Sequence, residues 1–318
     1  MITQTTCQLD RRPLKEYSLR RHKIFRSIVF PVDFSDTCKA TAQYVRDLAK
    51  LTGGTVTLLH VAPERSAWYG AADVHSGFDT YERLRGLKEM QMSALAIFRD
   101  EYFDGVDCQI RIESGSVADR IIDYTERSGT DLIMMPWSQT VSPARSFLGS
   151  VLEKVLRNAA CAVWTSPQSD KLKPFSGFHS IVCTISPNTI PSEYVSDTMT
   201  LGAIFGGKVS FVSAVAGSFE GDPRALSLEV ARSGCPLYFE TGPVGHVVRH
   251  VAEIQGADLV VINRRRKRDS METHANEIVL ESPCPVLYLP TKVTAASINI
   301  VRQTTRLEEE YFLAAGCC

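Results

Sequence analysis

Gly149 and Ser150 are the residues best placed to do chemistry, because they open a predicted helix over 150–158. The first N–H groups of a helix have no partner inside it. Together with the helix dipole they favour an anion such as a phosphate group. A second explanation stays open, because Glu153 follows Ser150 by three residues. That spacing is typical of a capping box, in which Ser150 would serve only the helix.

A run of five cations over 264–268 is a second candidate. Arginine binds phosphates and carboxylates through charge-assisted hydrogen bonds, so Arg264, Arg265 and Arg266 are candidates for an anion site or for contact with an acidic partner. A solvated loop is the alternative, and it also stays open. One basic loop on a chain of net charge −1 is weak support for nucleic-acid binding, which we do not expect.

His246 and His250 lie four residues apart on a predicted helix over 243–255, the spacing of two metal ligands on one helix face. The sequence has neither HExxH nor CxxC, and valines form the apolar face of this helix. We therefore expect both histidines to face water or the domain boundary, and we predict no metal site. The sequence also lacks a G-x-S-x-G elbow, a Walker lysine motif and a G-x-G-x-x-G turn, so nothing in it points to catalysis.

Four sequence blocks occur twice in the same order, which indicates a duplicated domain. The first copies read RSIVFPVDFSDT, GGTVTLLHVAP, GSVADRIIDYTERSGTDLIMM and NAACAVWTSP. Their counterparts read HSIVCTISPNT, GGKVSFVSAVA, GPVGHVVRHVAEIQGADLVVI and ESPCPVLYLP. We predict domains over 25–166 and 179–290, a linker over 167–178, an amino-terminal extension over 1–24 and a carboxyl-terminal tail over 291–318.

Each copy alternates apolar strand-like runs with helical segments, a pattern that predicts an α/β fold. The apolar runs of the first copy are nearly continuous, as in strands of a parallel sheet that is covered on both faces. We predict strands near 26–32, 54–61, 106–112, 131–135 and 161–166, and helices near 36–51, 78–103, 116–128 and 150–158.

The composition is that of an ordinary soluble protein, with 44% hydrophobic and 22% charged residues among 318. No apolar run approaches the roughly 20 residues of a membrane-spanning helix. A secretory signal has an apolar segment after its basic residues, and no such segment follows the basic residues near the amino terminus. Several of the nine cysteines lie inside apolar runs, so we expect a reducing, cytoplasmic compartment and no membrane partner.

These blocks resemble the universal stress protein family, in a tandem arrangement that covers residues 25–290. The segments that carry the resemblance are SIVFPVDFSD, VTLLHVAP, DLIMM and LGSVLEKVLRNAACAVW, with weaker echoes in the second copy. The resemblance implies two doubly wound five-stranded parallel sheets, each in the order 3-2-1-4-5. It also implies that their fifth strands meet, so that the tandem chain forms a pseudo-dimer. A homo-oligomer of the whole chain is the other assembly that we expect.

The resemblance further implies an adenosine site in the first copy. Ligands of open α/β sheets bind beyond the carboxyl ends of the strands where the strand order reverses, here between strands 1 and 4. The implied contacts and the candidate phosphate positions are Pro31, Val32, Asp33, Val61, Met135, Gly149, Ser150 and Val151. Asp33 can accept hydrogen bonds from ribose or adenine, or can make a local turn before the following helix, and both explanations stay open.

The phosphate end keeps only part of the pattern of the ATP-binding members, which is G-x2-G-x9-G-[ST]. Pro136 and Gln139 replace the first two glycines, so one position lacks an N–H group and the other carries a side chain where a phosphate needs room. Gly149 and Ser150 keep the rest. We therefore expect weak binding of ATP, or of a nucleotide with less phosphate such as AMP.

The second copy departs further, because Ser186 replaces Asp33 and no Gly-Ser pair remains, so we predict a vestigial site there. The resulting prediction is a non-enzymatic stress-response protein that acts through ligand-sensitive association. A weak ATPase or nucleotide switch of the same fold is one alternative. A purely structural partner-binding module is another.

Overall fold

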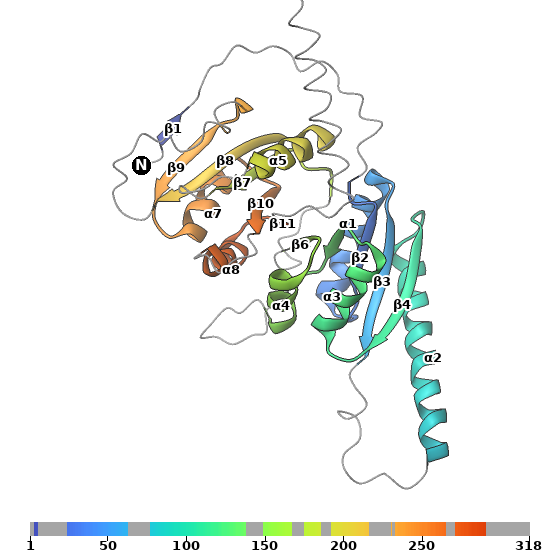
Figure 1. Cartoon of the computed structure of the whole chain (residues 1–318). Coiled ribbons are helices and arrows are strands. Elements are labelled where there is room, and N and C mark those ends of the chain that lie inside the picture. Colours follow the sequence, from blue (N-terminus) through green and yellow to red (C-terminus); the bar gives the residue numbers. More distant parts are fainter. Residues whose placement is uncertain are drawn as a thin grey trace, which may run out of the picture.

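The computed structural model shows one continuous sheet with helices packed against it (Figure 1). It describes residues 3–5, 24–62, 77–137, 149–166, 175–185, 192–215, 230, 233–264 and 271–290. The strands are β1 (Thr3–Thr5), β2 (Ser27–Pro31), β3 (Thr55–Ala62), β4 (Cys108–Ser114), β5 (Leu132–Met134), β6 (Ala162–Thr165), β7 (Ser180–Thr184), β8 (Lys208–Val215), β9 (Leu237–Thr241), β10 (Leu259–Arg264) and β11 (Val286–Pro290). The helices described are α1 (Asp36–Thr52), α2 (Gly77–Tyr102), α3 (Val117–Ser128), α4 (Ser150–Asn158), α5 (Ser192–Phe205), α7 (Val244–Ile254) and α8 (Met271–Glu281).

The strand order is the same in both halves of the chain. The first half contributes β4-β3-β2-β5-β6 and the second half contributes β9-β8-β7-β10-β11. Within each half, neighbouring strands are parallel. When the strands of each half are numbered along the chain, both orders are the predicted 3-2-1-4-5. The halves meet through β6 and β11, which pair antiparallel with Trp164 opposite Leu287. The predicted doubly wound α/β class and the pseudo-dimer are therefore confirmed.

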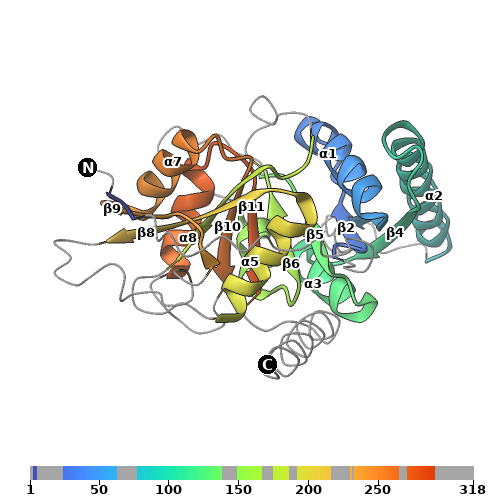
Figure 2. The same cartoon turned by 90° about the horizontal axis from the view of Figure 1, so that it is seen from above.

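The two ends of the sheet differ. Strand β1, in the amino-terminal extension, was not predicted; it pairs antiparallel with β9, with Thr3 opposite Phe239 and Thr5 opposite Leu237. At the other end β4 is the last strand of the sheet formed by the described residues. Figure 2 shows β1 beside β9 at one end of the molecule, and α2 beside β4 at the opposite end. Equivalent strands of the two halves therefore meet different neighbours.

Two hydrophobic clusters hold the helices against the sheet. One contains side chains from α1, α2 and α5, among them Leu48 and Leu201. The other contains side chains from α3, α4, α7 and α8, among them Ile121 and Val247. Successive strand residues alternate between the clusters, as Phe30 and Val29 of β2 do, which explains the nearly continuous apolar runs of the sequence.

A series of aromatic contacts joins the two halves near the end of the predicted linker. The ring centroid of Tyr44 on α1 lies 4.6 Å from that of Phe175, and Phe175 lies 5.2 Å from Phe178. Phe178 in turn lies 4.7 Å from Phe205 on α5. The described end of the linker is thus part of the packed core, and Phe178 is only 1% exposed.

Local capping signals fix both ends of α1. The side-chain oxygen of Ser35 accepts a hydrogen bond from the N–H of Cys38 at 3.2 Å, which satisfies one of the free donors of the first turn. At the other end Gly53 adopts a left-handed conformation, with φ of 62°, and its N–H donates to the carbonyl of Ala49. The amino-terminal cap matters most for function, because it fixes the turn that carries Asp33.

Candidate functional site

The switch point of the first half lies between β2 and β5, which are parallel, hydrogen-bonded neighbours with Val29 opposite Ile133. Asp33 and Met135 follow the carboxyl ends of these strands, so both lie at the same edge of the sheet. Helix α4 connects the parallel strands β5 and β6 and must run back along the sheet. Its amino terminus at Gly149 therefore lies at this edge as well. The topology brings the predicted adenosine and phosphate positions to one edge.

Asp33 makes a local turn, which is one of the two roles that the sequence left open for it. Its Oδ1 accepts hydrogen bonds from the backbone N–H of Ser35 at 2.9 Å and from the Ser35 hydroxyl at 2.7 Å. Asp33 itself is exposed to solvent. An ionised carboxylate has about four acceptor positions. Asp33 can therefore support the cap of α1 and still accept hydrogen bonds from a ligand.

Phe34 holds this turn in an unusual conformation, with φ of 62°, which is uncommon for a residue other than glycine. Its ring centroid lies 5.3 Å from that of His60 and 6.0 Å from that of Phe98. These contacts from β3 and α2 hold the side chain while the backbone reverses. Strained residues of this kind concentrate at functional sites, where the surrounding structure fixes them.

Val32 is less available than its neighbours. It is 3% exposed, and its N–H donates to the carbonyl of Leu59 at 2.9 Å. Its carbonyl lies 2.8 Å from Nδ1 of His60. Because a carbonyl oxygen only accepts, Nδ1 carries the proton in this contact. Both backbone groups of Val32 are therefore engaged within the protein.

Cys38 lies beneath the same turn and is fully buried. Burial is the main cause that raises the pKa of its thiol to about 12, and the nearby charge of Asp33 adds to the increase. A thiol with so high a pKa stays protonated near neutral pH. Cys38 is thus a small core residue and offers no thiolate to a ligand.

Val61 presents its backbone to the switch point. Leu59 faces β2, because its carbonyl accepts the N–H of Val32, and Ala62 faces β4, because its carbonyl accepts the N–H of Gly115 at 3.0 Å. Alternate residues of a strand face the same side, so Val61 faces β2 like Leu59. The register of β2 ends at Pro31, opposite Leu59. The N–H and C=O of Val61 therefore point past the end of β2, toward the Asp33 turn.

The chain after β5 stays on the sheet for a few residues. Met135 donates its N–H to the carbonyl of Trp164 at 3.1 Å, and Trp137 donates to Ser166 at 3.2 Å. Met135 and Trp137 are 8% and 4% exposed and belong to the same hydrophobic cluster as the side chains of Val61 and Leu152. Trp137 therefore covers core. Gln139 lies outside the described residues.

The predicted capping box at Ser150 is wrong. Gly149 is the cap residue of α4, with φ of 80° and no side-chain hydrogen bond, and Ser150 is the first helical residue. The carboxylate of Glu153 instead lies 2.9 Å from Nη2 of Arg157. A Cβ at Gly149 would meet no atom within 4 Å, so the positive φ, and not a lack of space, favours glycine here. Ser150 and the half-buried Val151 begin a helix whose cap supplies no side chain.

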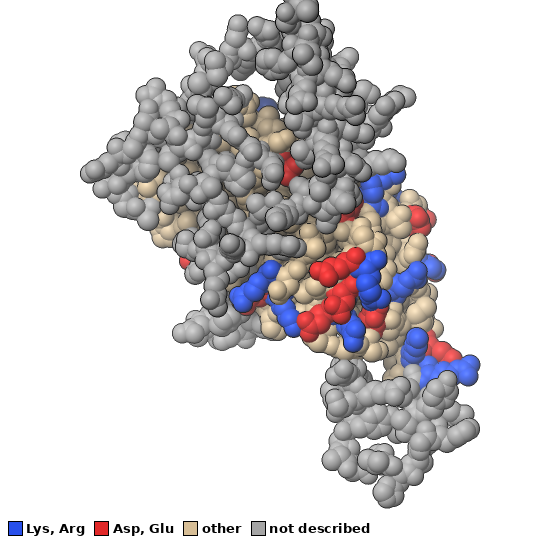
Figure 3. All heavy atoms as spheres, in the orientation of Figure 1, with Lys and Arg blue, Asp and Glu red and all other residues tan. Residues whose placement is uncertain are grey.

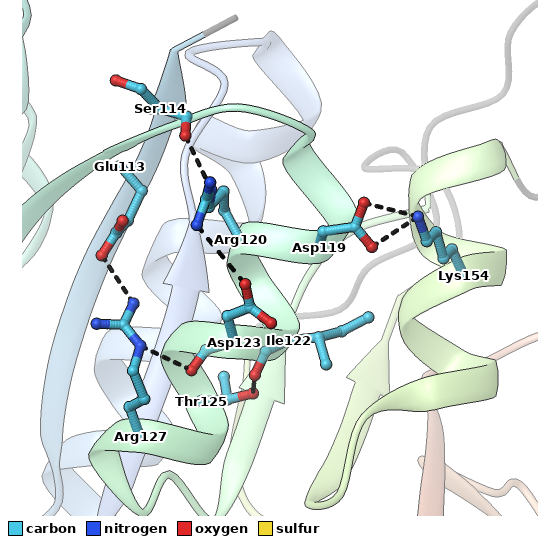
Figure 4. Close-up of polar contacts among 9 residues, drawn as sticks. All are labelled: Glu113, Ser114, Asp119, Arg120, Ile122, Asp123, Thr125, Arg127 and Lys154. Atoms are coloured by element: carbon cyan, nitrogen blue, oxygen red, sulfur yellow. Dashed lines mark hydrogen bonds and ion pairs between the residues drawn. The ribbon is translucent and has the colours of Figure 1, made fainter. Parts of the chain in front are cut away.

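A charge pair flanks the first turns of α4. Nζ of Lys154 lies 2.6 Å from Oδ1 of Asp119 on α3, as Figure 4 shows. The hydrogen bond from Lys154 is the main cause that lowers the pKa of Asp119 below its ordinary value. Because Lys154 lies one turn after Ser150, its charge is close to the helix start. Asp119 offsets that charge.

The second half places its candidates differently. Arg264 is the last residue of β10, opposite Pro290, whereas Arg265, Arg266 and Ser186 lie outside the described residues. The run over 264–268 thus begins at the carboxyl end of the strand that is equivalent to β5.

The two histidines of α7 contact separate carboxylates. Nδ1 of His250 lies 3.0 Å from Glu240, and Nδ1 of His246 lies 3.8 Å from Glu281. Among the described residues no group of three or more His, Cys, Asp or Glu side chains is arranged to hold a metal ion.

Charges of both signs are mixed on the face seen in Figure 3, where blue and red side chains alternate. The ion pairs of α3 and α4 include Arg127 with Glu113 at 3.1 Å and Arg157 with Glu153. A search of the described helices for a stretch long and apolar enough to cross a membrane finds none.

Comparison with known proteins gives consistent results. Residues 24–167 match the model of the universal stress protein family. Two universal stress proteins of Methanocaldococcus jannaschii are similar to the chain: one is 27% identical over 44% of this chain and 81% of its own length, the other 26% identical over 43% and 91%. A solved universal stress protein from Archaeoglobus fulgidus superposes with a TM-score of 0.61 at 17% identity, covering 85% of this chain and 98% of its own. A functionally unknown protein from Pseudomonas aeruginosa gives a TM-score of 0.53 at 17% identity, covering 84% and 93%. These two structural likenesses concern the fold, and they extend over both halves.

Proposed function

We propose that the first half of the chain, whose residues 24–167 match the model of the universal stress protein family, binds an adenine nucleotide with few phosphates. The site is the edge of the sheet where β2 and β5 end. The protein acts by ligand-sensitive association and does not turn the ligand over. AMP is the nucleotide that the residues at this edge fit best.

The backbone of Val61 is the observation that carries the proposal. Its N–H and C=O point past the end of β2, so one donor and one acceptor are available side by side. The edge of an adenine ring offers the complementary acceptor and donor. Asp33 lies on the adjacent turn, exposed, and can accept hydrogen bonds from ribose hydroxyls. This arrangement supports recognition of a nucleoside.

The phosphate end supports a short phosphate chain. The free N–H groups at the start of α4 suit one phosphate, because the cap residue Gly149 has no side chain to occupy them. Pro136 has no N–H to donate. Asp119 offsets the charge of Lys154, the cation nearest the helix start along α4. A triphosphate would need donors or cations that these residues do not offer.

Isothermal titration calorimetry with AMP, ADP and ATP tests the proposal. We expect AMP to bind at least as tightly as ATP. We expect Asp33→Asn to weaken AMP binding about tenfold, the effect of losing one charge-assisted hydrogen bond. Asparagine keeps an oxygen that can accept the bonds from Ser35, so the cap of α1 is retained. Asp36→Asn is the matched control, because Asp36 is an exposed carboxylate on the first turn of the same helix.

Two results would count against the proposal. One is the absence of heat with all three nucleotides at millimolar concentration. The other is an equal loss of affinity in both variants, because a general change of charge near α1 would then explain the effect. A preference for ATP over AMP would overturn the part of the proposal that concerns phosphate number.

A further inference from the structure

The outer strand of each half has backbone groups that point away from its neighbour. On β4, Asp107 accepts the N–H of Val56 and Gly115 donates to Ala62, so odd-numbered residues face β3. The even-numbered residues therefore face outward. Such open edges readily pair with strands of other molecules, and natural proteins protect them.

Arginine side chains protect β4. Nη1 of Arg111 donates to the outward carbonyl of Ile110 at 2.8 Å, and Nε of Arg120 donates to that of Ser114 at 2.9 Å. Figure 4 shows Arg120 reaching back from α3 to Ser114. These carbonyls are thus occupied, and the guanidinium groups lie where an incoming strand would pair.

The second half lacks these arginines. Gly242 donates to Val215 as Gly115 donates to Ala62, which aligns the two outer strands. By this alignment Tyr238 takes the place of Arg111, and Val247 takes the place of Arg120. Neither side chain carries a guanidinium group that can cover the edge carbonyls of β9.

Strand β1 covers the edge of β9 instead. Pro236 and Gly242 both bond to β8, so the even-numbered residues face β8, and Leu237 and Phe239 face outward. These two residues lie opposite Thr5 and Thr3. In an antiparallel ladder such pairs exchange both of their hydrogen bonds. By the alignment above Leu237 is equivalent to Ile110, whose carbonyl Arg111 covers on β4. The amino-terminal strand therefore covers that equivalent edge position and Phe239, whereas Thr241, the equivalent of Ser114, lies beyond its pairing.

We propose that the edge of β9 is a docking site for an extended peptide strand, and that the same amino-terminal segment from a second copy of this chain occupies it in trans. The resident strand is three residues long and makes two hydrogen-bonded pairs, so it leaves the edge easily. This segment pairs with β9 of its own chain. The identical segment of a second copy can therefore pair with the same edge. Because β1 belongs to the same chain as β9, its effective concentration at this edge is high, which favours the cis form at low protein concentration.

A peptide competition experiment on the full chain tests this proposal. The variant Thr3→Pro/Thr5→Pro keeps the full length of the chain but removes the two N–H groups that face β9. The matched control Gln4→Ala changes the residue whose backbone faces away. The probe is a fluorescein-labelled peptide of residues 1–9, with serine in place of Cys7, and fluorescence anisotropy reports its binding.

We expect the peptide to bind the double proline variant about tenfold or more tightly than it binds the wild type or the control, because the tethered strand no longer competes. N-methylation of the peptide at residues 3 and 5 should abolish binding, and N-methylation at residue 4 should not. Equal binding to all three proteins, binding to none, or the reverse methylation pattern would overturn the proposal.

Amide hydrogen exchange on the unmodified chain gives a second test that does not depend on the variant folding. If β1 leaves the edge by local opening, the amides of Leu237 and Phe239 exchange faster than that of Val212 in β8, which lies inside the sheet. Equal exchange rates at these three amides would mean that β1 stays in place until the whole chain unfolds, and the proposal would fail.

Discussion

Asp131 and Asp258 occupy equivalent places in the two halves and do the same work. The carboxylate of Asp131 accepts the backbone N–H groups of Arg26 and Ser27 at 2.8 Å and 3.1 Å. That of Asp258 accepts the N–H groups of His179 and Ser180, at distances that include 2.7 Å and 3.2 Å. Each aspartate precedes the fourth strand of its half and holds the amino end of the first strand. The repeated GTDL and GADL segments thus preserve a structural clip.

Removing either clip should destabilise the fold. We expect Asp131→Ala and Asp258→Ala each to lower the free energy of unfolding by about 1–3 kcal/mol, because two backbone donors lose their acceptor. Asp123→Ala is the control, since its contact with Arg120 is an exposed ion pair, and such pairs contribute about 0–1 kcal/mol. Urea denaturation measures all three values. An effect of Asp131→Ala no larger than that of the control would contradict the role assigned to the clip.

The clip should also make stability depend on pH. Burial is the main cause that raises the pKa of Asp131 above its ordinary value of 3.8, and the same holds for Asp258. An acid whose pKa is higher in the folded state holds its proton more tightly there. It contributes stability below the unfolded pKa and loses that contribution as the pH rises through the folded pKa. We therefore expect the stability of the wild type relative to Asp131→Asn to fall as the pH rises above about 4. Urea denaturation between acidic and neutral pH measures this difference, and a rise with pH would contradict it.

Two helical glycines should respond in opposite directions to alanine. A Cβ at Gly245 on α7 would lie 2.9 Å from the carbonyl oxygen of Glu277 on α8, and a Cβ at Gly86 on α2 would meet nothing within 4 Å. We expect Gly86→Ala to stabilise the protein by about 0.5–1 kcal/mol, the difference in helix propensity. We expect Gly245→Ala to destabilise it by about 1–3 kcal/mol, because the packed helices must separate. Thermal unfolding of both variants checks the contrast, and changes of the same sign would contradict it.

The arginines of β4 should keep the chain from associating through that edge. We expect Arg111→Ala/Arg120→Ala to increase self-association, because the outward carbonyls of Ile110 and Ser114 become free to accept hydrogen bonds from another strand. Arg127→Ala is the matched control, since Arg127 binds the side chain of Glu113 on the same face. Light scattering coupled to size-exclusion chromatography measures the molecular mass of each variant. A double variant with the mass of the wild type would show that other features protect this edge.

The fold was predictable to a large extent from local patterns. The expected helix over 150–158 coincides with α4, and the expected helix over 116–128 differs from α3 by one residue. Turn and cap signals such as Ser35 and Gly53 act within a few residues, so they are readable in the sequence. Ser150 was misread because a capping box and a first helical turn share the same letters, and only the conformation of Gly149 separates them.

The candidate site was predictable in its position and not in its contacts. Strand order places the Asp33 turn and the start of α4 at one edge, and that order followed from the family resemblance. The sequence did not reveal that Asp33 binds Ser35, that Lys154 pairs with Asp119 or that both backbone groups of Val32 are engaged. Each of these depends on the side-chain geometry that packing selects among several possible partners.

The sequence by itself determined the duplication, the alternation of strands and helices, and the class of fold, because apolar periodicity and capping act over short stretches of chain. Only the tertiary structure decided how each edge of the sheet is closed. Arg111 and Arg120 cover the edge of β4. At the opposite end of the sheet, Thr3–Thr5 pair with β9. Open backbone groups accept any donor that packing brings within reach, so their partners depend on residues far apart in the sequence.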